Sequence, residues 1–420
     1  MLRKDRRKFL KWLTIITIFS SFLIILWMNQ ENNNNNSFPD KIPDGFGVNV
    51  HFNGDPIDVD LIEDAGFKIV RKDLFWDNVE KERGKYDFTK YDQLTNALIK
   101  EGIRPYYILA YSNTLYEANR SIVTKEGQEA FARYAEEATS RYKNKGIIWE
   151  IWNEPNIGFW EPKPNFNEYS SLVKKVSKVI KENDPSGVVV APALSGLNEE
   201  SLKWLEEIFK EGILDYIDAV SVHPYRVSNP ETVGKDYQSL RELIDKYTNK
   251  EIAIISGEWG YSTAKGWNGL ELTEKEQADY LVRMFFVNLL YDVPISIWYD
   301  WKNDGIDSNN GEHNFGLREH NVIKPKKGYM AINTLTYILS GYKLNERINI
   351  GDPDDYMLEF INENEDKVIV FWTSRNKQKT TLPLRVEGRV VSVLGEEKGY
   401  LKNKTTIELS SSPNYLILDN

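Results

Sequence analysis

The sequence predicts a (β/α)8 TIM barrel of the α/β class, followed by a small C-terminal antiparallel β-sandwich domain. From residue 45 to residue 342, eight short apolar runs alternate with amphipathic helical stretches, which is typical of parallel βαβ units. After Gly341 the pattern changes to short alternating runs separated by polar turns, which indicates an antiparallel sheet. An open doubly wound sheet is the alternative for the first part, but no glycine-rich phosphate turn follows the first apolar run.

The expected barrel strands are the short runs rich in β-branched and aromatic residues. They lie near residues 46–52, 67–72, 103–109, 147–152, 187–191, 219–223, 252–256 and 295–299. Apolar residues recur at helical spacing in the stretches between them, for instance at 125–142, 168–183, 201–210 and 274–290. Thr273 and Glu276 have capping-box spacing, so the last of these helices is expected to begin there.

The expected β-domain covers residues 343–420 and packs on the barrel. Its predicted strands lie at 356–362, 367–373, 380–386, 389–394, 405–410 and 414–418. A further strand from the segment before the barrel is left open.

The N-terminus has the pattern of a membrane anchor. Residues 3–11 carry six basic side chains against one acid, and the uncharged apolar run 12–28 would span roughly 25 Å as a helix. We therefore expect a basic segment and single-pass transmembrane anchor over residues 1–28, an Asn-rich linker over 29–44 and an extracytoplasmic barrel. A cleaved signal that releases a secreted protein is the alternative, and Arg6-Arg7 leaves twin-arginine export open.

The composition excludes several classes of partner. The chain of 420 residues has a net charge of −10 and no basic stripe beyond its N-terminus, which argues against nucleic acid. It has no cysteine, so it holds neither disulfides nor thiolate metal sites. We expect a monomer that needs no cofactor.

Two glutamates carry the chemistry. Glu154 follows the fourth apolar run within Trp152-Asn153-Glu154-Pro155-Asn156, and Glu258 ends the seventh. In a barrel both strand ends face one cavity. Two carboxylates converging on one cavity suit glycoside hydrolysis, in which one protonates the leaving oxygen and the other stabilises or attacks the anomeric carbon.

These motifs resemble clan A glycoside hydrolases, in particular family thirty-nine and relatives that cut bacterial exopolysaccharides. The resemblance rests on residues 152–156 and 257–260, with support from Val70-Arg71, His223-Pro224-Tyr225 and residues 297–301. It implies that Glu154 is the acid/base and Glu258 the nucleophile of a retaining double displacement. The two carboxyl groups are then expected roughly 5–5.5 Å apart.

The remaining site residues have supporting roles. Asn153 is expected to donate to the sugar 2-hydroxyl, and Arg71 to pair with Glu258 or, as second candidate, Glu150. The resemblance implies that Tyr225 hydrogen-bonds the nucleophile, whereas His223 is either a site residue or a core histidine. Sugar contacts are expected from several indoles: Trp298 as a floor, and Trp76, Trp160, Trp267 and Trp301 as stacking surfaces.

The loop 300–313 is rich in Asp and Asn, but its spacing fails the EF-hand pattern, because Lys302 occupies a ligand position and Gly311 replaces the terminal Glu. No metal is required by the expected mechanism.

The sequence thus predicts a membrane-tethered retaining glycosidase that cuts an extracellular polysaccharide internally. The alternatives are an exo-acting xylosidase-type enzyme on oligosaccharides, transglycosylation through the same intermediate, and a non-hydrolytic polysaccharide-binding or assembly protein.

Overall fold

The computed structural model describes residues 38–419, apart from residues 53, 376 and 377. The expected anchor and most of the expected linker therefore lie outside the described residues. Within that described range, no helix is long and apolar enough to cross a membrane.

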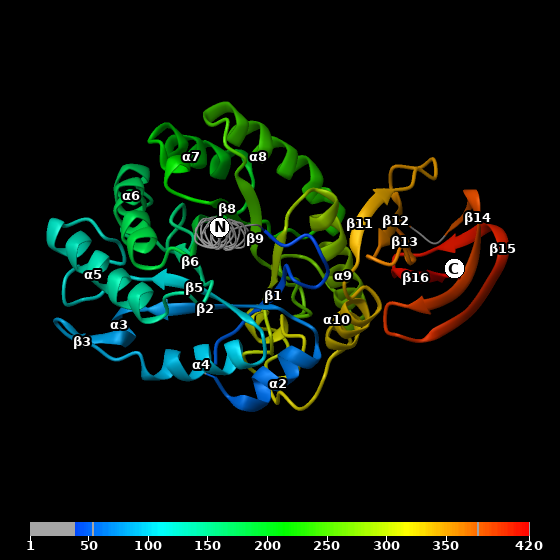
Figure 1. Ribbon diagram of the computed structural model, residues 1–420, viewed down its shortest axis with the longest axis horizontal. Coiled ribbons are helices and arrows are strands. Elements are labelled where there is room, and N and C mark those ends of the chain that lie inside the picture. The colour runs from blue at the N-terminus through cyan, green and yellow to red at the C-terminus, as the bar shows by residue number, and fades with distance from the viewer. Residues whose placement is uncertain (1–37, 53, 376–377, 420) are drawn as a thin grey trace, which may run out of the picture. The chain divides into compact units, whose positions relative to one another are not determined.

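The barrel is closed by eight parallel strands, as the sequence predicts (Figure 1). Their order around the barrel follows the chain: β1 (Phe46–Asn49), β2 (Ile69–Phe75), β5 (Arg104–Ala110), β6 (Ile148–Ile151), β7 (Val188–Ser195), β8 (Ala219–His223), β9 (Ala253–Trp259) and β10 (Ile295–Trp298). The closing contact pairs β1 with β10 in parallel register.

Helices surround the barrel and return the chain from one strand to the next. They are α2 (Pro56–Asp64), α3 (Trp76–Val79), α4 (Thr89–Lys100), α5 (Lys125–Arg141), α6 (Phe166–Asn183), α7 (Glu199–Lys210), α8 (Gly234–Tyr247), α9 (Glu274–Leu290) and α10 (Lys327–Ile338). Short 3-10 turns occur at Ile213–Asp215, Pro230–Val233 and Gly311–Asn314, and the hairpin of β3 (Glu80–Glu82) and β4 (Lys85–Tyr86) follows α3. The predicted capping box at the start of α9 is present, with Thr273 and Glu276 bonding reciprocally.

Two layers of apolar side chains hold the barrel. Its interior is filled by a separate cluster that includes Ile69, Tyr106, Ile148, Val190 and Ile255. The opposite face of each strand packs against the helices in the main core. Because the interior is filled, the open space of a barrel lies beyond the carboxyl ends of the strands.

The C-terminal domain is a six-stranded antiparallel sheet in the order β11-β12-β13-β16-β14-β15. Its strands are β11 (Lys343–Arg347), β12 (Asp355–Ile361), β13 (Lys367–Thr373), β14 (Gln378–Ser392), β15 (Glu397–Leu409) and β16 (Asn414–Leu418). Met357, Ile369 and Leu416 share a core with Val386 and Ile407 of the long strands, so the sheet encloses an apolar interior.

The strands of this domain differ in two details from the sequence prediction, and the question left open for the segment before the barrel is answered. The runs 380–386 and 389–394 form one continuous strand, β14. The edge strand β11 was missed because Lys-Leu-Asn-Glu-Arg has one apolar residue in five. Residues 38–45, before β1, contribute no strand to this sheet.

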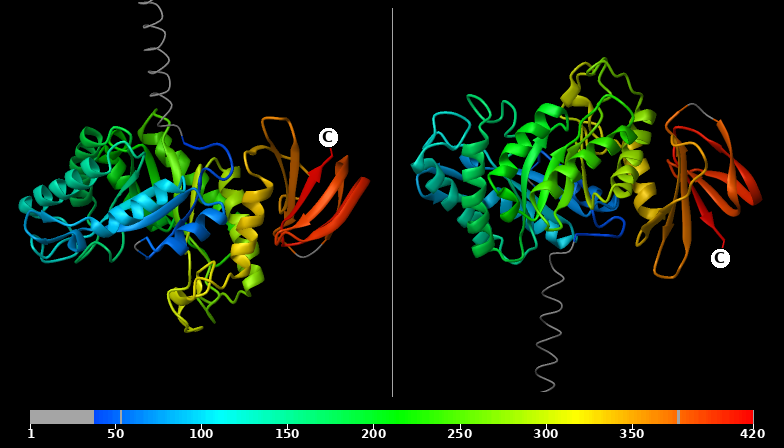
Figure 2. Two further views of the ribbon diagram at one scale, coloured as in Figure 1. Left: turned by 60° about the horizontal axis from the view of Figure 1, so that its bottom comes forward. Right: turned by 90° about the horizontal axis from the view of Figure 1, so that it is seen from above.

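The β-domain packs against α9 of the barrel (Figure 2). The ring of Trp372 stacks on Phe286 at a centroid distance of 5.8 Å. Its indole nitrogen donates to Glu231 at 2.7 Å, and Glu231 in turn forms a bidentate pair with Arg283. Barrel and β-domain thus share one continuous apolar core.

Candidate active site

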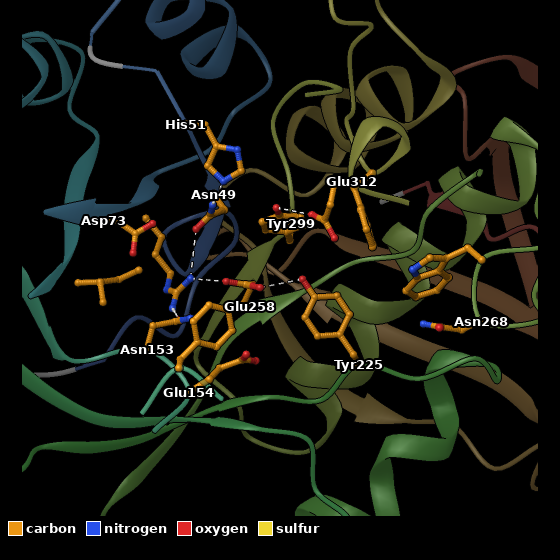
Figure 3. Close-up of a pocket in the computed structure, with 15 residues that line it drawn as sticks. Asn49, His51, Asp73, Asn153, Glu154, Tyr225, Glu258, Asn268, Tyr299 and Glu312 are labelled. Atoms are coloured by element: carbon orange, nitrogen blue, oxygen red, sulfur yellow. Dashed lines mark hydrogen bonds and ion pairs between the residues drawn. The ribbon is translucent and has the colours of Figure 1, made fainter. Parts of the chain in front are cut away.

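A cavity of about 470 Å³ lies at the carboxyl ends of the barrel strands. Its lining comes from β1, β2, β5 and β9 and from the loops that follow the strands: Asn49, His51, Arg71, Asp73, Ile108, Asn153, Glu154, Phe159, Tyr225, Glu258, Trp267, Asn268, Tyr299, Glu312 and Phe315. Glu154 and Glu258 both line this cavity and are labelled in Figure 3. The two strand-end glutamates therefore meet, as the barrel topology requires.

Strained backbone turns Glu154 into the cavity. Just beyond β6, Trp152 and Glu154 adopt φ values of 70° and 48°. This left-handed region costs a non-glycine residue about 1–2 kcal/mol. Two backbone bonds hold the turn, from the Trp152 N–H to the Leu109 carbonyl (3.2 Å) and from the Glu154 N–H to the Ala193 carbonyl (3.1 Å). Strain of this kind is concentrated at functional sites.

Glu258 is held by one partner on each carboxylate oxygen. Arg71 Nη1 donates to Oε2 at 2.6 Å, and the Tyr225 hydroxyl donates to Oε1 at 2.9 Å. Burial raises the pKa of this carboxyl, whereas the charge of Arg71 and the hydrogen bonds from Tyr225 and Arg71 lower it, and the pKa of Glu258 lies below its ordinary value. These interactions favour the ionised form of Glu258, which its expected role as nucleophile requires.

Arg71 joins both of its expected anionic partners. Besides Glu258, its Nε donates to Glu150 Oε2 at 2.9 Å, and the Tyr106 hydroxyl donates to the other oxygen of Glu150 at 2.8 Å. Arg71 is 1% exposed and Glu150 is fully buried. A buried charge requires a paired and hydrogen-bonded partner. Arg71 has two such partners, the fully buried Glu150 and the cavity-lining Glu258.

The tautomer of His223 follows from its two neighbours. Its Nε2 lies 3.2 Å from Arg71 Nη2, and a guanidinium nitrogen can only donate. Nε2 therefore accepts, and the ring proton sits on Nδ1, which donates to Glu154 Oε1 at 2.9 Å. This bond occupies Oε1 of Glu154 and leaves Oε2 available for the acid/base role expected of this residue. Of the two interpretations left open by the sequence, the structure makes His223 a positioning residue at the site, although its ring is fully buried.

Asn153 is oriented by the same guanidinium. Its Oδ1 accepts from Arg71 Nη2 at 2.8 Å, so its Nδ2 is the group that can donate to a ligand. Asn49 is fixed in the same way, with Oδ1 3.2 Å from Arg71 Nη1. Arg71 therefore sets the geometry of Glu258 and of two amides together.

Four of the five tryptophans expected to contact sugar are instead core residues. Trp76, Trp160 and Trp298 are 0% exposed and Trp301 is 1% exposed, and none of them lines the cavity. Each indole N–H is used internally; Trp301, for example, donates to Asp58 at 2.6 Å. Strand-end position alone does not show on which side of the strand a side chain points, and these rings point into the packed layers. Trp267 does line the cavity.

The lining includes residues that sequence reasoning missed. Tyr299, which directly follows the misassigned Trp298, faces the cavity and donates its hydroxyl to Glu312 Oε2 at 2.8 Å. Asp73 carried a usable signal, since it follows Arg71 by two residues on β2 and so shares its face. His51 and Glu312 lie in loops and gave no such signal.

The Asp-rich loop does approach β1, but the arrangement fits hydrogen bonding better than metal ligation. Potential ligand atoms of His51, Asp300 and Asp304 lie within 4.8 Å of one another. However, Asn49 Nδ2 faces His51 Nε2 at 3.3 Å, and that amide is fixed by Arg71. Nε2 thus accepts and Nδ1 carries the proton that it shares with Asp304 at 2.9 Å. A neutral imidazole that bound a metal through Nδ1 would need its proton on Nε2, opposite another donor.

Asp300 takes no hydrogen bond at Oδ1 from any residue that the structure describes. Burial raises the pKa of this carboxyl well above its ordinary value, so a neutral acid is accommodated there without an ion.

Comparison with known proteins places this geometry among glycoside hydrolases. The model of the cellulase family (glycosyl hydrolase family 5) matches residues 31–305. A family 39 glycoside hydrolase from the gut symbiont Bacteroides cellulosilyticus WH2 has a similar structure, with a TM-score of 0.77 and 25% identity over 91% of this chain and 83% of that one. A GH39 β-xylosidase from Caulobacter crescentus superposes with a TM-score of 0.66 at 17% identity, covering 91% of this chain and 98% of its own.

Among curated proteins, an endoglucanase of Clostridium saccharobutylicum is 27% identical over 177 residues, which is 41% of this chain. The chain spans only 34% of the length of that endoglucanase. The matches confirm the resemblance to clan A and to family thirty-nine that the motifs indicated.

Proposed function

The chain belongs to the cellulase family (glycosyl hydrolase family 5), and from that premise we propose that it is a retaining glycosidase that cuts an extracellular bacterial polysaccharide internally. The observation that carries this proposal is the pair of strand-end carboxylates with unequal partners. Glu258 is bonded by Arg71 and Tyr225, whereas Glu154 accepts one bond, from His223. The relatives named endoglucanase and β-xylosidase support a β-glycosidic bond as the target.

In the first step, a Glu258 oxygen attacks the anomeric carbon as the bond from that carbon to the leaving oxygen breaks. Glu154 passes its proton to the leaving oxygen, and the sugar remains bound to Glu258 as an ester. The positive charge on Arg71 keeps Glu258 ionised beforehand. The Asn153 amide, whose oxygen is taken by Arg71, donates to a hydroxyl of the reacting sugar.

In the second step, Glu154, now ionised, takes a proton from a water molecule as that water attacks the anomeric carbon. The ester bond breaks and returns its electron pair to Glu258, so both carboxyls regain their starting states. The proton donated by His223 Nδ1 stabilises Glu154 during this interval, when it is negative. Net retention of configuration at the anomeric carbon is the consequence.

Internal cleavage requires room for sugars on both sides of the cut bond. Figure 3 shows lining residues on both sides of Glu258, with Asp73 and Asn153 on one side and Tyr225 and Asn268 on the other. Asn268 is exposed at the rim, so the cavity is continuous with the surface there.

Exo action on short oligosaccharides is the second candidate, because one observation favours it. The indoles Trp76, Trp160 and Trp301, expected to stack on neighbouring sugars, are buried instead. The cavity of about 470 Å³ is also near the lower end of the range for ligand pockets.

The site of action is proposed from the N-terminal sequence. Six basic residues before the apolar run 12–28 favour a cytoplasmic N-terminus and a barrel outside the membrane, either tethered or released. Protease added to intact cells should then degrade the barrel, and an intact barrel after complete digestion of a surface marker would contradict this placement.

The activity is tested with Glu154→Gln and Glu258→Gln, with exposed Glu271→Gln as the matched control. Reducing ends released from polysaccharides, the size of the products and the anomer first formed are measured on the same enzyme. We expect a loss on the order of 10²- to 10⁴-fold for Glu154→Gln, essentially complete loss for Glu258→Gln, and an unchanged rate for the control.

Unchanged turnover in either variant would overturn the assignment, and an inverted first product would overturn the double displacement. Release of monosaccharide alone would decide for exo action. Polysaccharide binding without any turnover in the unaltered protein would favour the non-hydrolytic alternative.

A further inference from the structure

The charges around the cavity are strongly biased toward acid. Among the described residues that line it, the ionisable His, Arg, Asp and Glu side chains are two bases, Arg71 and His51, and four acids, Asp73, Glu154, Glu258 and Glu312. The carboxylate of Asp304 contacts the ring of His51. A substrate can interact strongly only with those charges that are not already paired within the protein.

Neither base is available. Arg71 is 1% exposed and directs its N–H groups at Glu150, Glu258, Asn49 and Asn153. A guanidinium has five N–H donors, and this one has no free direction left toward the cavity.

His51 is equally engaged, because its Nδ1 faces Asp304 at 2.9 Å and its Nε2 faces Asn49 at 3.3 Å. The neighbouring Lys72 is 5% exposed and does not line the cavity. An anionic group on a sugar would therefore meet no unpaired cation of this lining.

Two acids, by contrast, face the cavity with free oxygens. Asp73 accepts no side-chain hydrogen bond from any residue in the described part of the chain, and Glu312 accepts one, from Tyr299, on Oε2. Figure 3 shows these two acids on different sides of the cavity.

We propose that this cavity accepts sugars that carry no anionic substituent and excludes uronic acids and sulfated or phosphorylated sugars, with Asp73 and Glu312 as the acceptors that bind substrate hydroxyl or amino groups. The inference rests on the proposed glycosidase function and narrows its substrate class. Like charges brought together in a site of low dielectric are a strong means of rejecting a wrong ligand. One anionic group next to the cut bond should lower kcat/KM on the order of 100-fold.

The test compares matched β-glucan oligosaccharides that differ only in charge: neutral ones, ones oxidised to carboxylate at C6, and their 2-amino counterparts. A panel of neutral, amino, uronic and sulfated polysaccharides is assayed alongside for released reducing ends. We expect turnover confined to neutral and amino polymers, and carboxylate-bearing oligosaccharides to be cut, or to compete with the neutral polymer, on the order of 100-fold less well. Raising the salt from about 0.05 to 0.5 M should narrow that ratio, because exposed charges are screened.

Turnover of uronic or sulfated polymers within about tenfold of the neutral ones would overturn the charge selection while leaving the glycosidase function intact. A different result would contradict the proposed glycosidase function itself: turnover of the neutral polymer that is unchanged in the Glu258→Gln variant.

A pair of variants assigns the selection to the two acids. Glu312→Gln and Asp73→Asn should each lower the rate on neutral sugars severalfold yet raise the anionic-to-neutral rate ratio about tenfold, because one repulsive charge is gone. The control Glu271→Gln, which removes an exposed carboxylate that does not line the cavity, should leave the ratio unchanged. A merely structural role would lower both rates together, and an unchanged ratio in both acid variants would refute their assignment.

Discussion

The bond from Tyr225 to Glu258 can be removed with little disturbance of the fold, which makes Tyr225→Phe the sharpest test of the site. The hydroxyl donates to Glu258 Oε1 at 2.9 Å, and it is one of the groups that hold the pKa of Glu258 down. A hydrogen bond to a charged group contributes about 1.5–3 kcal/mol. Because this bond serves the ionised form of Glu258, its loss should raise the pKa of Glu258.

The assay is kcat/KM as a function of pH on a polymer that the unaltered enzyme cuts. Because an ionised nucleophile is required, the acid limb should move to higher pH, and kcat/KM on the plateau should fall about 10- to 100-fold. Tyr337→Phe is the control, since Tyr337 is 85% exposed. An acid limb that stays in place, with kcat/KM within twofold of the unaltered enzyme, would refute the role of Tyr225.

Three further predictions concern stability and ions. Folding lowers the pKa of Glu258 below the ordinary 4.5, so the stabilisation that its carboxylate contributes is present above pH 4.5 and is lost as the pH falls through the folded value. The Glu258→Gln variant should therefore lose less stability than the unaltered protein over that acid range. Parallel curves of unfolding free energy against pH for the two proteins would contradict the shift. Trp372→Ala removes a fully buried ring and should destabilise the protein by about 3–5 kcal/mol, measured by denaturant unfolding. The control Ile306→Ala, at a residue that is 90% exposed, should cost less than about 0.5 kcal/mol. Equal effects of the two substitutions would refute the packing argument. Chelation with EDTA should leave activity unchanged, because His51 presents a proton to Asp304, and activity lost to EDTA and restored by a divalent cation would show this tautomer to be wrong.

The strand–helix rhythm was readable because it is local. A buried parallel strand is a short apolar run, and an amphipathic helix repeats its apolar residues about every 3.6 positions. All eight barrel strands could therefore be placed from the pattern of apolar residues along the chain. The sequence does not predict strand β11, because an edge strand with one apolar residue in five lacks that pattern. Strand β14 was predicted as two strands because Glu387 and Gly388 separate its two runs of apolar residues.

By itself, the sequence determined the barrel and the meeting of Glu154 with Glu258, because parallel strands that close a barrel bring all their carboxyl ends to one face. It also determined that Arg71 must find an anion, because a charge on a buried strand cannot remain unpaired. Only the tertiary structure decided which side of each strand end faces the cavity, and so replaced Trp298 by Tyr299. The reason is geometric: a left-handed residue or an irregular turn at a strand end reorients the next side chain, and no local pattern encodes the loop that brings Glu312 or Asp304 across the barrel mouth.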